Sequence, residues 1–181
     1  MVFYSAHGKR TLSTVLHWLL VGIFGAGLLY AAVSDLRTLV IPNWLNLTLA
    51  GLFAPAAYLA GFDPMQILQQ YGVAMGFLAA GLVLFALKVM GGGDVKMLAA
   101  IAPWIEASKI LPFLIGVSIA GGVLALMIIA LRRLPADAVL RRWLPWLEDG
   151  AAVRQQPVPY GVAIAAAALW LLPGLDVVSM P

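Results

Sequence analysis

The chain has 181 residues, of which 63% are hydrophobic and only 10% are charged, and its mean hydropathy is +0.98. A soluble domain carries about 25% charged residues, so this composition predicts an integral membrane protein whose main solvent is the lipid bilayer. The net charge of +3 is small and the cations are scattered, which argues against a nucleic-acid groove, and the absence of cysteine excludes disulfides and thiolate metal sites.

The first predicted element is an apolar run from Val15 to Val33, preceded by Lys9 and Arg10. Its 19 residues, at about 1.5 Å each, nearly match a bilayer core of roughly 30 Å. The apolar region of a signal peptide is shorter, about 7–15 residues, and no small-residue cleavage site follows this run. The run therefore predicts a retained spanning helix, in which His17 is expected to be a packed polar residue rather than a base.

The following apolar runs predict further membrane segments. They are Trp44 to Gly61, Tyr71 to Leu87, Ile110 to Leu131 and Val158 to Leu172. The stretch from Val95 to Ile105 is apolar but short, and predicts a short helix packed among the others after a glycine-rich loop. The sequence thus predicts an all-α, polytopic membrane protein of about six transmembrane helices in a single domain, residues 1–181. Residues 131–150 alternate arginine pairs with Leu and Trp, and predict an amphipathic helix at the membrane interface.

The distribution of Lys and Arg predicts the orientation in the membrane. If the segments alternate, the joins after the first, third and fifth segments collect most of the cations, and the other side has three: Lys9, Arg10 and Lys109. The first group contains eight residues: Arg37, Lys88, Lys96, Arg132, Arg133, Arg141, Arg142 and Arg154. This excess predicts that the first group faces the cytoplasm, although the N-terminal pair argues mildly the other way.

Asp35 follows the first spanning run directly, in the stretch "SDLRTLVIPNWLN". Pro42 and Asn43 interrupt the chain before the second run, because proline suits the first turn of a helix and not its interior. Asp35 is therefore expected on a short hairpin between two membrane helices. The alternative is an ordinary interfacial charge that ends a helix, but acids at membrane depth are costly and usually functional.

The second candidate acid is Asp94, in "GGGDVKMLAAI". One reading is a glycine-rich turn whose acid caps a helix. The functional reading is that Gly91, Gly92 and Gly93 let a substrate strand approach, with Gly93 expected to hold a backbone geometry closed to β-branched residues. A phosphate-binding loop is disfavoured because an acid stands where the phosphate would lie.

Taken together, two carboxylates at the same depth on different helices can share one proton. That arrangement suits aspartic proteolysis, in which one carboxylate takes a proton from water and the other donates one to the peptide carbonyl. The chain has two histidines and lacks both a His-Glu-x-x-His zinc motif and a Gly-x-Ser-x-Gly elbow.

These motifs resemble the active-site motifs of the type IV prepilin peptidases, the Gly-x-Gly-Asp class of intramembrane aspartic proteases. The first corresponds to an acid a few residues before Ile-Pro-Asn, here Asp35, Pro42 and Asn43. The second corresponds to Gly-x-Gly-Asp-x-Lys, here Gly91, Gly93, Asp94 and Lys96. A third stretch, "VPYGVAIAAAAL", is similar to the late Pro-Tyr-Gly helix of the family and includes Tyr160.

The resemblance implies cleavage of a prepilin leader after a glycine, at the cytoplasmic face of the bacterial inner membrane, with no metal or organic cofactor. Larger members carry a Cys-x-x-Cys zinc domain and also N-methylate their product. This cysteine-free chain resembles the short, peptidase-only members, such as those serving Tad/Flp-type pili. Lys96 can tune the acids, bind a substrate carboxylate or simply snorkel, and Tyr160 can bond near the acids or be an interfacial aromatic.

Two other functions remain open at this stage. In a small proton- or cation-coupled transporter, Asp35 and Asp94 would form a relay around a helix broken by the glycines. In a non-catalytic assembly scaffold, neither acid would be needed. The resemblance names no particular prepilin and no oligomeric state.

Overall fold

The computed structural model describes residues 3–131 and 158–179, and all of the regular structure in these residues is helical. The described α-helices are α1 (Phe3–Thr38), α2 (Asn43–Leu59), α3 (Pro64–Ala86), α4 (Gly92–Ile101), α5 (Ile110–Leu131) and α6 (Tyr160–Leu171). Single 3-10 turns follow α4, precede α5 and follow α6: η1 (Ala102–Trp104), η2 (Ala107–Lys109) and η5 (Leu172–Gly174).

Three helical stretches are long and apolar enough to cross a membrane: Thr11–Thr38, Pro64–Ala86 and Ala107–Leu131. They correspond to three of the predicted spans, and the large apolar side chains on their outer faces are exposed, as expected of a membrane protein. The predicted count of about six spans is not confirmed, because α2, α4 and α6 have only 17, 10 and 12 residues. The expected short helix is present as α4, but its predicted start at Val95 was wrong: α4 begins at Gly92, so Gly93 and Asp94 lie in its first turn and not in a loop before it.

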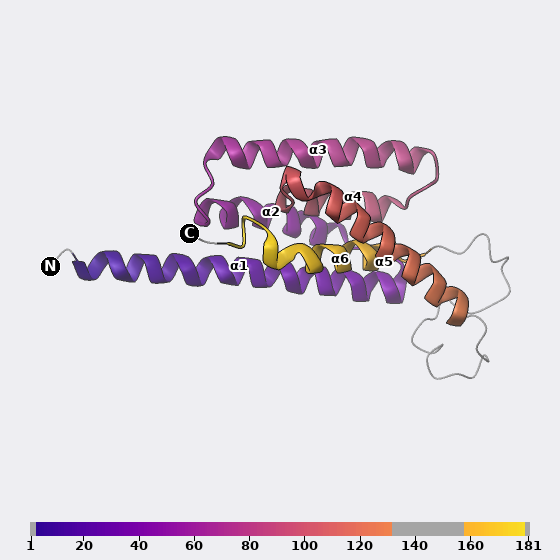
Figure 1. Cartoon of the computed structure of the whole chain (residues 1–181), viewed down its shortest axis with the longest axis horizontal. Coiled ribbons are helices and arrows are strands. Elements are labelled where there is room, and N and C mark those ends of the chain that lie inside the picture. The colour runs from indigo at the N-terminus through magenta and orange to yellow at the C-terminus, as the bar shows by residue number, and fades with distance from the viewer. Residues whose placement is uncertain (1–2, 132–157, 180–181) are drawn as a thin grey trace.

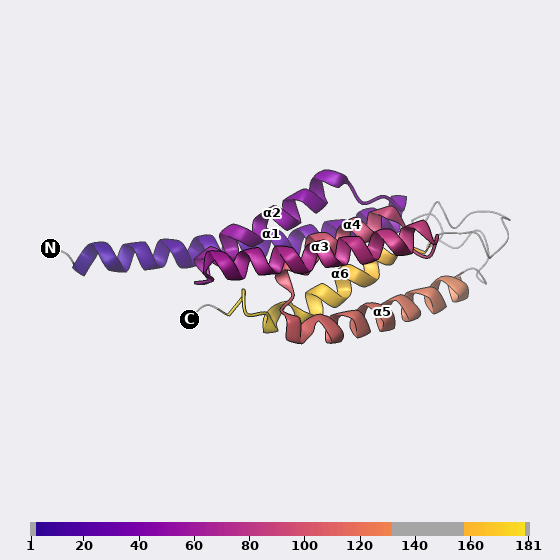
Figure 2. The ribbon, with the colours of Figure 1, turned by 90° about the horizontal axis from the view of Figure 1, so that it is seen from above.

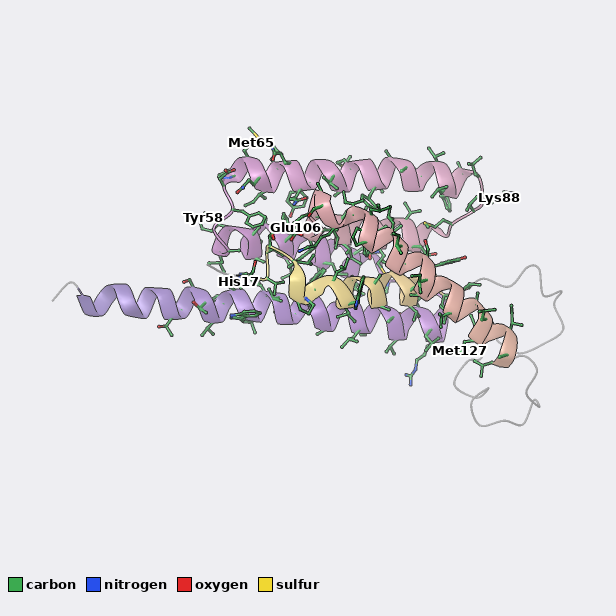
Figure 3. The ribbon with its side chains drawn as sticks, viewed as in Figure 1. His17, Tyr58, Met65, Lys88, Glu106 and Met127 are labelled. Carbon is green, nitrogen blue, oxygen red and sulfur yellow. The ribbon has the colours of Figure 1, made fainter. Side chains whose placement is uncertain are left out.

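The helices alternate in direction along the long axis of the molecule (Figure 1). The turns after α1 and α3 lie at one end, together with the start of α6, and the join between α2 and α3 lies at the opposite end. In Figure 3, Lys88 marks the first end, and Tyr58 and Met65 mark the other. Asp35 and Asp94 both lie at the first end, which we call the carboxylate end.

Helix α4 occupies the middle of the bundle and contacts α2, α3 and α6, while α6 contacts α1, α4 and α5. Seen from above, α2 and α5 lie at opposite edges of the bundle (Figure 2). The short helices α4 and α6 are therefore the inner elements, and their N-termini meet at the carboxylate end.

Aromatic and polar contacts hold α1 and α2 to the centre of the bundle. The ring of Trp104 stacks on Phe24 with 3.8 Å between ring centroids, and its indole N–H donates to the Leu49 carbonyl at 2.9 Å. His17 is fully buried and its Nδ1 lies 3.2 Å from the Ala56 carbonyl oxygen, to which it donates. The expectation that His17 is an interhelical polar residue is thus confirmed.

The predicted Val15–Val33 run is part of a much longer helix, because α1 has 36 residues and a length of roughly 54 Å. The helix ends at Thr38, where Leu39 adopts a φ of 55° and its N–H bonds to the Asp35 carbonyl at 2.9 Å. Asp35 is therefore a residue of the last turn of α1, and the prediction that it hangs on a hairpin was wrong. The predicted span was ended at the last residue of the apolar run, whereas the helix continues through a polar last turn.

The turn between α1 and α2 is short and held by side-chain hydrogen bonds. The hydroxyl of Ser34 donates to the Val40 carbonyl, and that of Thr38 donates to the Ser34 carbonyl, each at 2.8 Å. Pro42 is the extended N-cap residue of α2, as its fixed φ favours. This turn brings Ile41 back over the last turn of α1. The predicted amphipathic stretch at residues 131–150 lies, beyond Leu131, outside the described residues.

Candidate active site

The two candidate acids line one small pocket at the carboxylate end. Its volume is about 170 Å³, and Asp35 and Asp94 are 4% and 9% exposed. The other residues of its wall are Leu39, Ile41, Gly91, Gly92, Gly93 and Val158. The structure thus joins two motifs that are 59 positions apart in the sequence, since positions 35 and 94 face the same cavity.

Asp35 is held by the first turn of α6. The backbone N–H of Gly161 donates to Asp35 Oδ2 at 2.7 Å, and the N–H of Val162 also bonds to this carboxyl. Helix α6 has no side-chain cap of its own, because its N-cap residue is Pro159. Asp35 therefore satisfies N–H groups that the start of a helix leaves without an intrahelical partner, and the helix dipole favours negative charge at this place.

Asp94 lies in the first turn of α4, with Gly91 as the extended N-cap residue. Burial and, to a smaller extent, the neighbouring Asp35 carboxylate together raise the pKa of Asp94 to about 7, against hydrogen bonds from the backbone of Gly91 and Gly161 that lower it. The two acids are near enough to interact electrostatically, and the backbone of Gly161 bonds to both of them. A carboxyl with a pKa near 7 can either hold or release a proton at neutral pH.

Gly161 is the residue of the site that sequence reasoning left without a role. A Cβ at this position would lie 2.7 Å from Asp35 Oδ2, 3.0 Å from Asp35 Cγ and 2.6 Å from Ile41 Cδ1. No side chain fits there without moving the carboxylate. The Pro-Tyr-Gly stretch was the available signal, but it drew attention to the aromatic residue rather than to the glycine after it.

Tyr160 points away from the acids. A Cβ on Gly121 of α5 would lie 3.3 Å from Tyr160 Cε1, so the ring packs across α5, and 39% of the residue is exposed. Of the two roles considered for Tyr160, the structure therefore favours a partly exposed aromatic at a helix interface. It is not among the residues that line the carboxylate pocket.

Lys96 also faces away from Asp94, as expected for two residues that lie two positions apart on a helix. Its ammonium donates to Asn43 Oδ1 at 2.9 Å, and this bond ties α4 to the first residue of α2. Lys96 is exposed while Asp94 is buried. The two motif residues Asn43 and Lys96 are thus partners of each other, outside the carboxylate pocket.

The glycines before Asp94 differ from the expectation. Among the described glycines only Gly61 has a positive φ, so the backbone of Gly93 is not closed to other residues. A Cβ on Gly93 would meet only Ile41 Cβ, at 3.9 Å. A Cβ on Gly91 would lie 2.9 Å from Asp94 Oδ2, and one on Gly92 would lie 3.3 Å from the Phe85 ring. The structural need for glycine is therefore greatest at Gly91, and the prediction for Gly93 was wrong.

The family model of the type IV leader peptidases (Peptidase A24) matches residues 22–126, which is more than half of the chain. The chain belongs to the type IV leader peptidase family. The match includes Asp35, Asp94 and Lys96 and stops before Tyr160 and Gly161, so the part of the site supplied by α6 is a finding of the structure. Comparison with curated proteins and with solved structures finds no match to the chain.

Proposed function

We propose that the protein is an intramembrane aspartic endopeptidase that cleaves the leader of type IV, Flp-like prepilins after a glycine. The observation that carries the proposal is the shared pocket: Asp35 and Asp94 come from different helices and line one cavity of about 170 Å³. Two carboxyls that interact so closely titrate as a pair, and one proton between them is the state that aspartic proteolysis requires. Membership of a leader peptidase family supports the choice of reaction.

The two acids would take different parts in the reaction. Asp94, with a pKa of about 7, would hold the proton, and Asp35 would accept a proton from the attacking water. The hydroxide attacks the peptide carbonyl while Asp94 donates its proton to the carbonyl oxygen. The resulting tetrahedral diol then collapses: the C–N bond breaks, a carboxyl returns a proton to the leaving amine, and a new carboxylic acid and a new amine are released.

The backbone of Gly161 supports the ionised form of Asp35 in the resting site. Its N–H bond to Asp35 at 2.7 Å is a charge-assisted hydrogen bond, which stabilises an ionised carboxylate. The N–H of Val162, in the same turn of α6, also bonds to Asp35 and supports its ionised form.

We further propose that the pocket faces the cytoplasm. The cations Arg37, Lys88 and Lys96 lie at the carboxylate end, whereas Lys109 follows the opposite end of α4. By the positive-inside rule, this distribution supports a carboxylate end on the cytoplasmic side of the bacterial inner membrane. A basic leader held on that side would stop beside the pocket, with the apolar segment of the prepilin in the membrane.

Cleavage by the purified protein tests the activity. Detergent-purified wild type should cut a prepilin-like peptide, and Asp35→Asn and Asp94→Asn should each lower the rate by at least about 1,000-fold, because neither acid can take the role of the other. Asp176→Asn is the matched control: Asp176 is an exposed acid outside the carboxylate pocket, so its variant should cleave normally. Near-normal cleavage by either Asn variant of the pair would refute the assignment.

Thiol labelling tests the orientation. The chain has no cysteine, so single Cys variants carry no background. Val40→Cys lies in the turn after α1, and Met65→Cys lies at the start of α3; both side chains are exposed, at 59% and 61%. A membrane-impermeant thiol reagent added to intact cells should label Met65→Cys and spare Val40→Cys. The reverse pattern would place the carboxylate end outside.

A further inference from the structure

A second hollow begins at the carboxylate end, on the other side of α4. It is a groove of about 590 Å³ between α2, α3 and α4. Its walls are mainly apolar: Leu47, Ala50, Ala74, Met75, Leu78, Ala99 and Ala100. The three remaining residues of the wall, Asn43, Asn46 and Lys96, are polar.

The polar residues form two levels of the groove. Asn43 and Lys96 lie in the first turns of α2 and α4, and they bond to each other at the end nearest Asp94. Asn46 lies one turn further along α2, so it lines the groove at a deeper level. Because α2 and α4 both begin at the carboxylate end, the groove runs from this end toward the middle of the molecule.

The carboxamide of Asn46 is anomalous for a helix interface. The residue is 6% exposed, and in the described part of the chain neither Nδ2 nor Oδ1 has a hydrogen-bond partner. Buried polar groups are normally paired, and an orphaned carboxamide is costly in an apolar setting. A partner brought by a bound ligand would remove that cost.

The chemistry of the carboxamide limits the class of ligand. Asn46 has both donors and an acceptor to satisfy. An acyl chain satisfies neither, and the ester groups of a phospholipid offer acceptors only. A peptide group offers both an N–H and a C=O, but only where the main chain is extended, since in a helix these groups bond internally.

We propose that the groove binds an extended stretch of the substrate's main chain, with Asn46 hydrogen-bonded to one of its peptide groups and the Asn43–Lys96 pair at the entrance. This inference rests on the proposed function, because a peptide cut at the pocket must leave the helical conformation near the scissile bond. In lipid, the unpaired main-chain groups of such a stretch need partners. The groove supplies partners beside apolar walls that suit the adjoining apolar side chains.

The larger hollow between α3 and α5, of about 760 Å³, is a weaker candidate. Its wall has one polar side chain, the exposed Ser118, and no described buried group that lacks a partner.

Peptide binding to a protein that cannot cleave tests the groove separately from the reaction. In an Asp94→Asn background, the Kd of a fluorescent peptide with a basic leader and an apolar segment should rise at least about 10-fold on Asn46→Leu. The matched control is Thr48→Val, an exposed polar residue of the same helix whose hydroxyl bonds to the Trp44 carbonyl. The control should leave the Kd unchanged. The thermal midpoint of Asn46→Leu should not fall, because the change removes an unpaired polar group.

A second variant, Ala50→Phe, keeps Asn46 but fills the groove that both residues line, and should weaken binding by a similar factor. An unchanged Kd of the peptide in a folded Asn46→Leu variant would overturn the proposal. If Asn46→Leu does not fold, an unchanged Kd in Ala50→Phe would overturn it instead. The proposal would also be overturned if these variants lost binding to phosphatidylglycerol micelles but kept their binding to the peptide, since the occupant of the groove would then be a lipid. A different result would separate the two proposals. If peptide binding depends on Asn46 but the wild type cleaves no peptide, the proposed protease activity is refuted and the proposed peptide-binding groove is retained.

Discussion

On the side of α4 that faces α1 and α6, Asp94 is buried beside a second acid in a small pocket. On the side that faces α2, Lys96 is exposed and bonds to a neutral carboxamide at the entrance of an apolar groove. The two residues are two positions apart, so a place suited to proton transfer and a place suited to binding lie on opposite faces of the same helical turn. The ammonium of Lys96 is thus bonded to the start of α2, on the side of α4 away from the acids.

The largest effect that separates the two sides is expected at Gly161. Gly161→Ala should lower cleavage by at least about 100-fold, because the new Cβ would lie 2.7 Å from Asp35 Oδ2 and must displace the carboxylate. A misplacement of about 1 Å in an active site costs on the order of 100-fold in rate. The turnover rate of purified protein measures the effect.

Gly122→Ala is the control for Gly161→Ala, since a Cβ at Gly122 meets nothing within 4 Å. It should leave both the rate and the thermal midpoint nearly unchanged. Full activity of Gly161→Ala would show that α6 does not position Asp35, and the side of α4 that faces α6 would lose its assigned role.

The stability of the fold should depend on pH through Asp94. The pKa of this group is raised to about 7 in the folded protein from 3.8, so its contribution to stability is fully present below about pH 4 and is lost as the pH rises through about 7. Asp94→Asn removes that loss. The variant should therefore match the wild type in thermal midpoint at pH 4 and exceed it at pH 8, by about 5 °C or more. A variant that is less stable than wild type at pH 8 would mean that the carboxyl is not held in a destabilising environment.

Much of this arrangement follows from the sequence, and the reasons are specific. Apolar runs placed α2, α3, α5 and α6 within a few residues, apart from the start of α3 at Pro64, where a capping box between Asp63 and Gln66 begins the helix. The first apolar run predicted an end of α1 at Val33, which is too early, because Ser34 to Thr38 are helical although they include polar and charged residues. The two acids were found because their residue types are rare in such a setting.

What the sequence could not show was the part of the site contributed across space. The bond from Gly161 to Asp35 joins residues 126 positions apart, and the bond from Lys96 to Asn43 joins residues 53 positions apart. A motif lists residues without saying which of them touch. Gly93 shows the reverse error: a glycine in a motif was given a backbone role, whereas its φ is not positive.

A smaller effect is expected on the other side of α4. Lys96→Met should lower cleavage a few-fold, because one exposed hydrogen bond between α2 and α4 is lost. The shape of the pH–rate profile should not change, since the ammonium faces away from the acids. Asn43→Ala should have a similar effect, and the double variant should be no worse than either single variant. A profile shifted along the pH axis would mean that Lys96 tunes the charge of the pair after all.

The smallest effect is expected among the glycines at the start of α4, where the structure reverses the order that the motif implies. Gly93→Ala should change cleavage by less than about 3-fold, because a Cβ there meets only Ile41 Cβ at 3.9 Å and alanine is the better helix former by roughly 0.5–1 kcal/mol. Gly92→Ala should be more harmful, since its Cβ would press on the Phe85 ring at 3.3 Å, although the motif leaves this middle position free. Parallel rates and thermal midpoints of the two variants decide the order. A severe loss of activity in Gly93→Ala with an unchanged thermal midpoint would mean that the substrate, rather than the fold, requires the bare backbone at Gly93. The pocket would then extend along the first turn of α4.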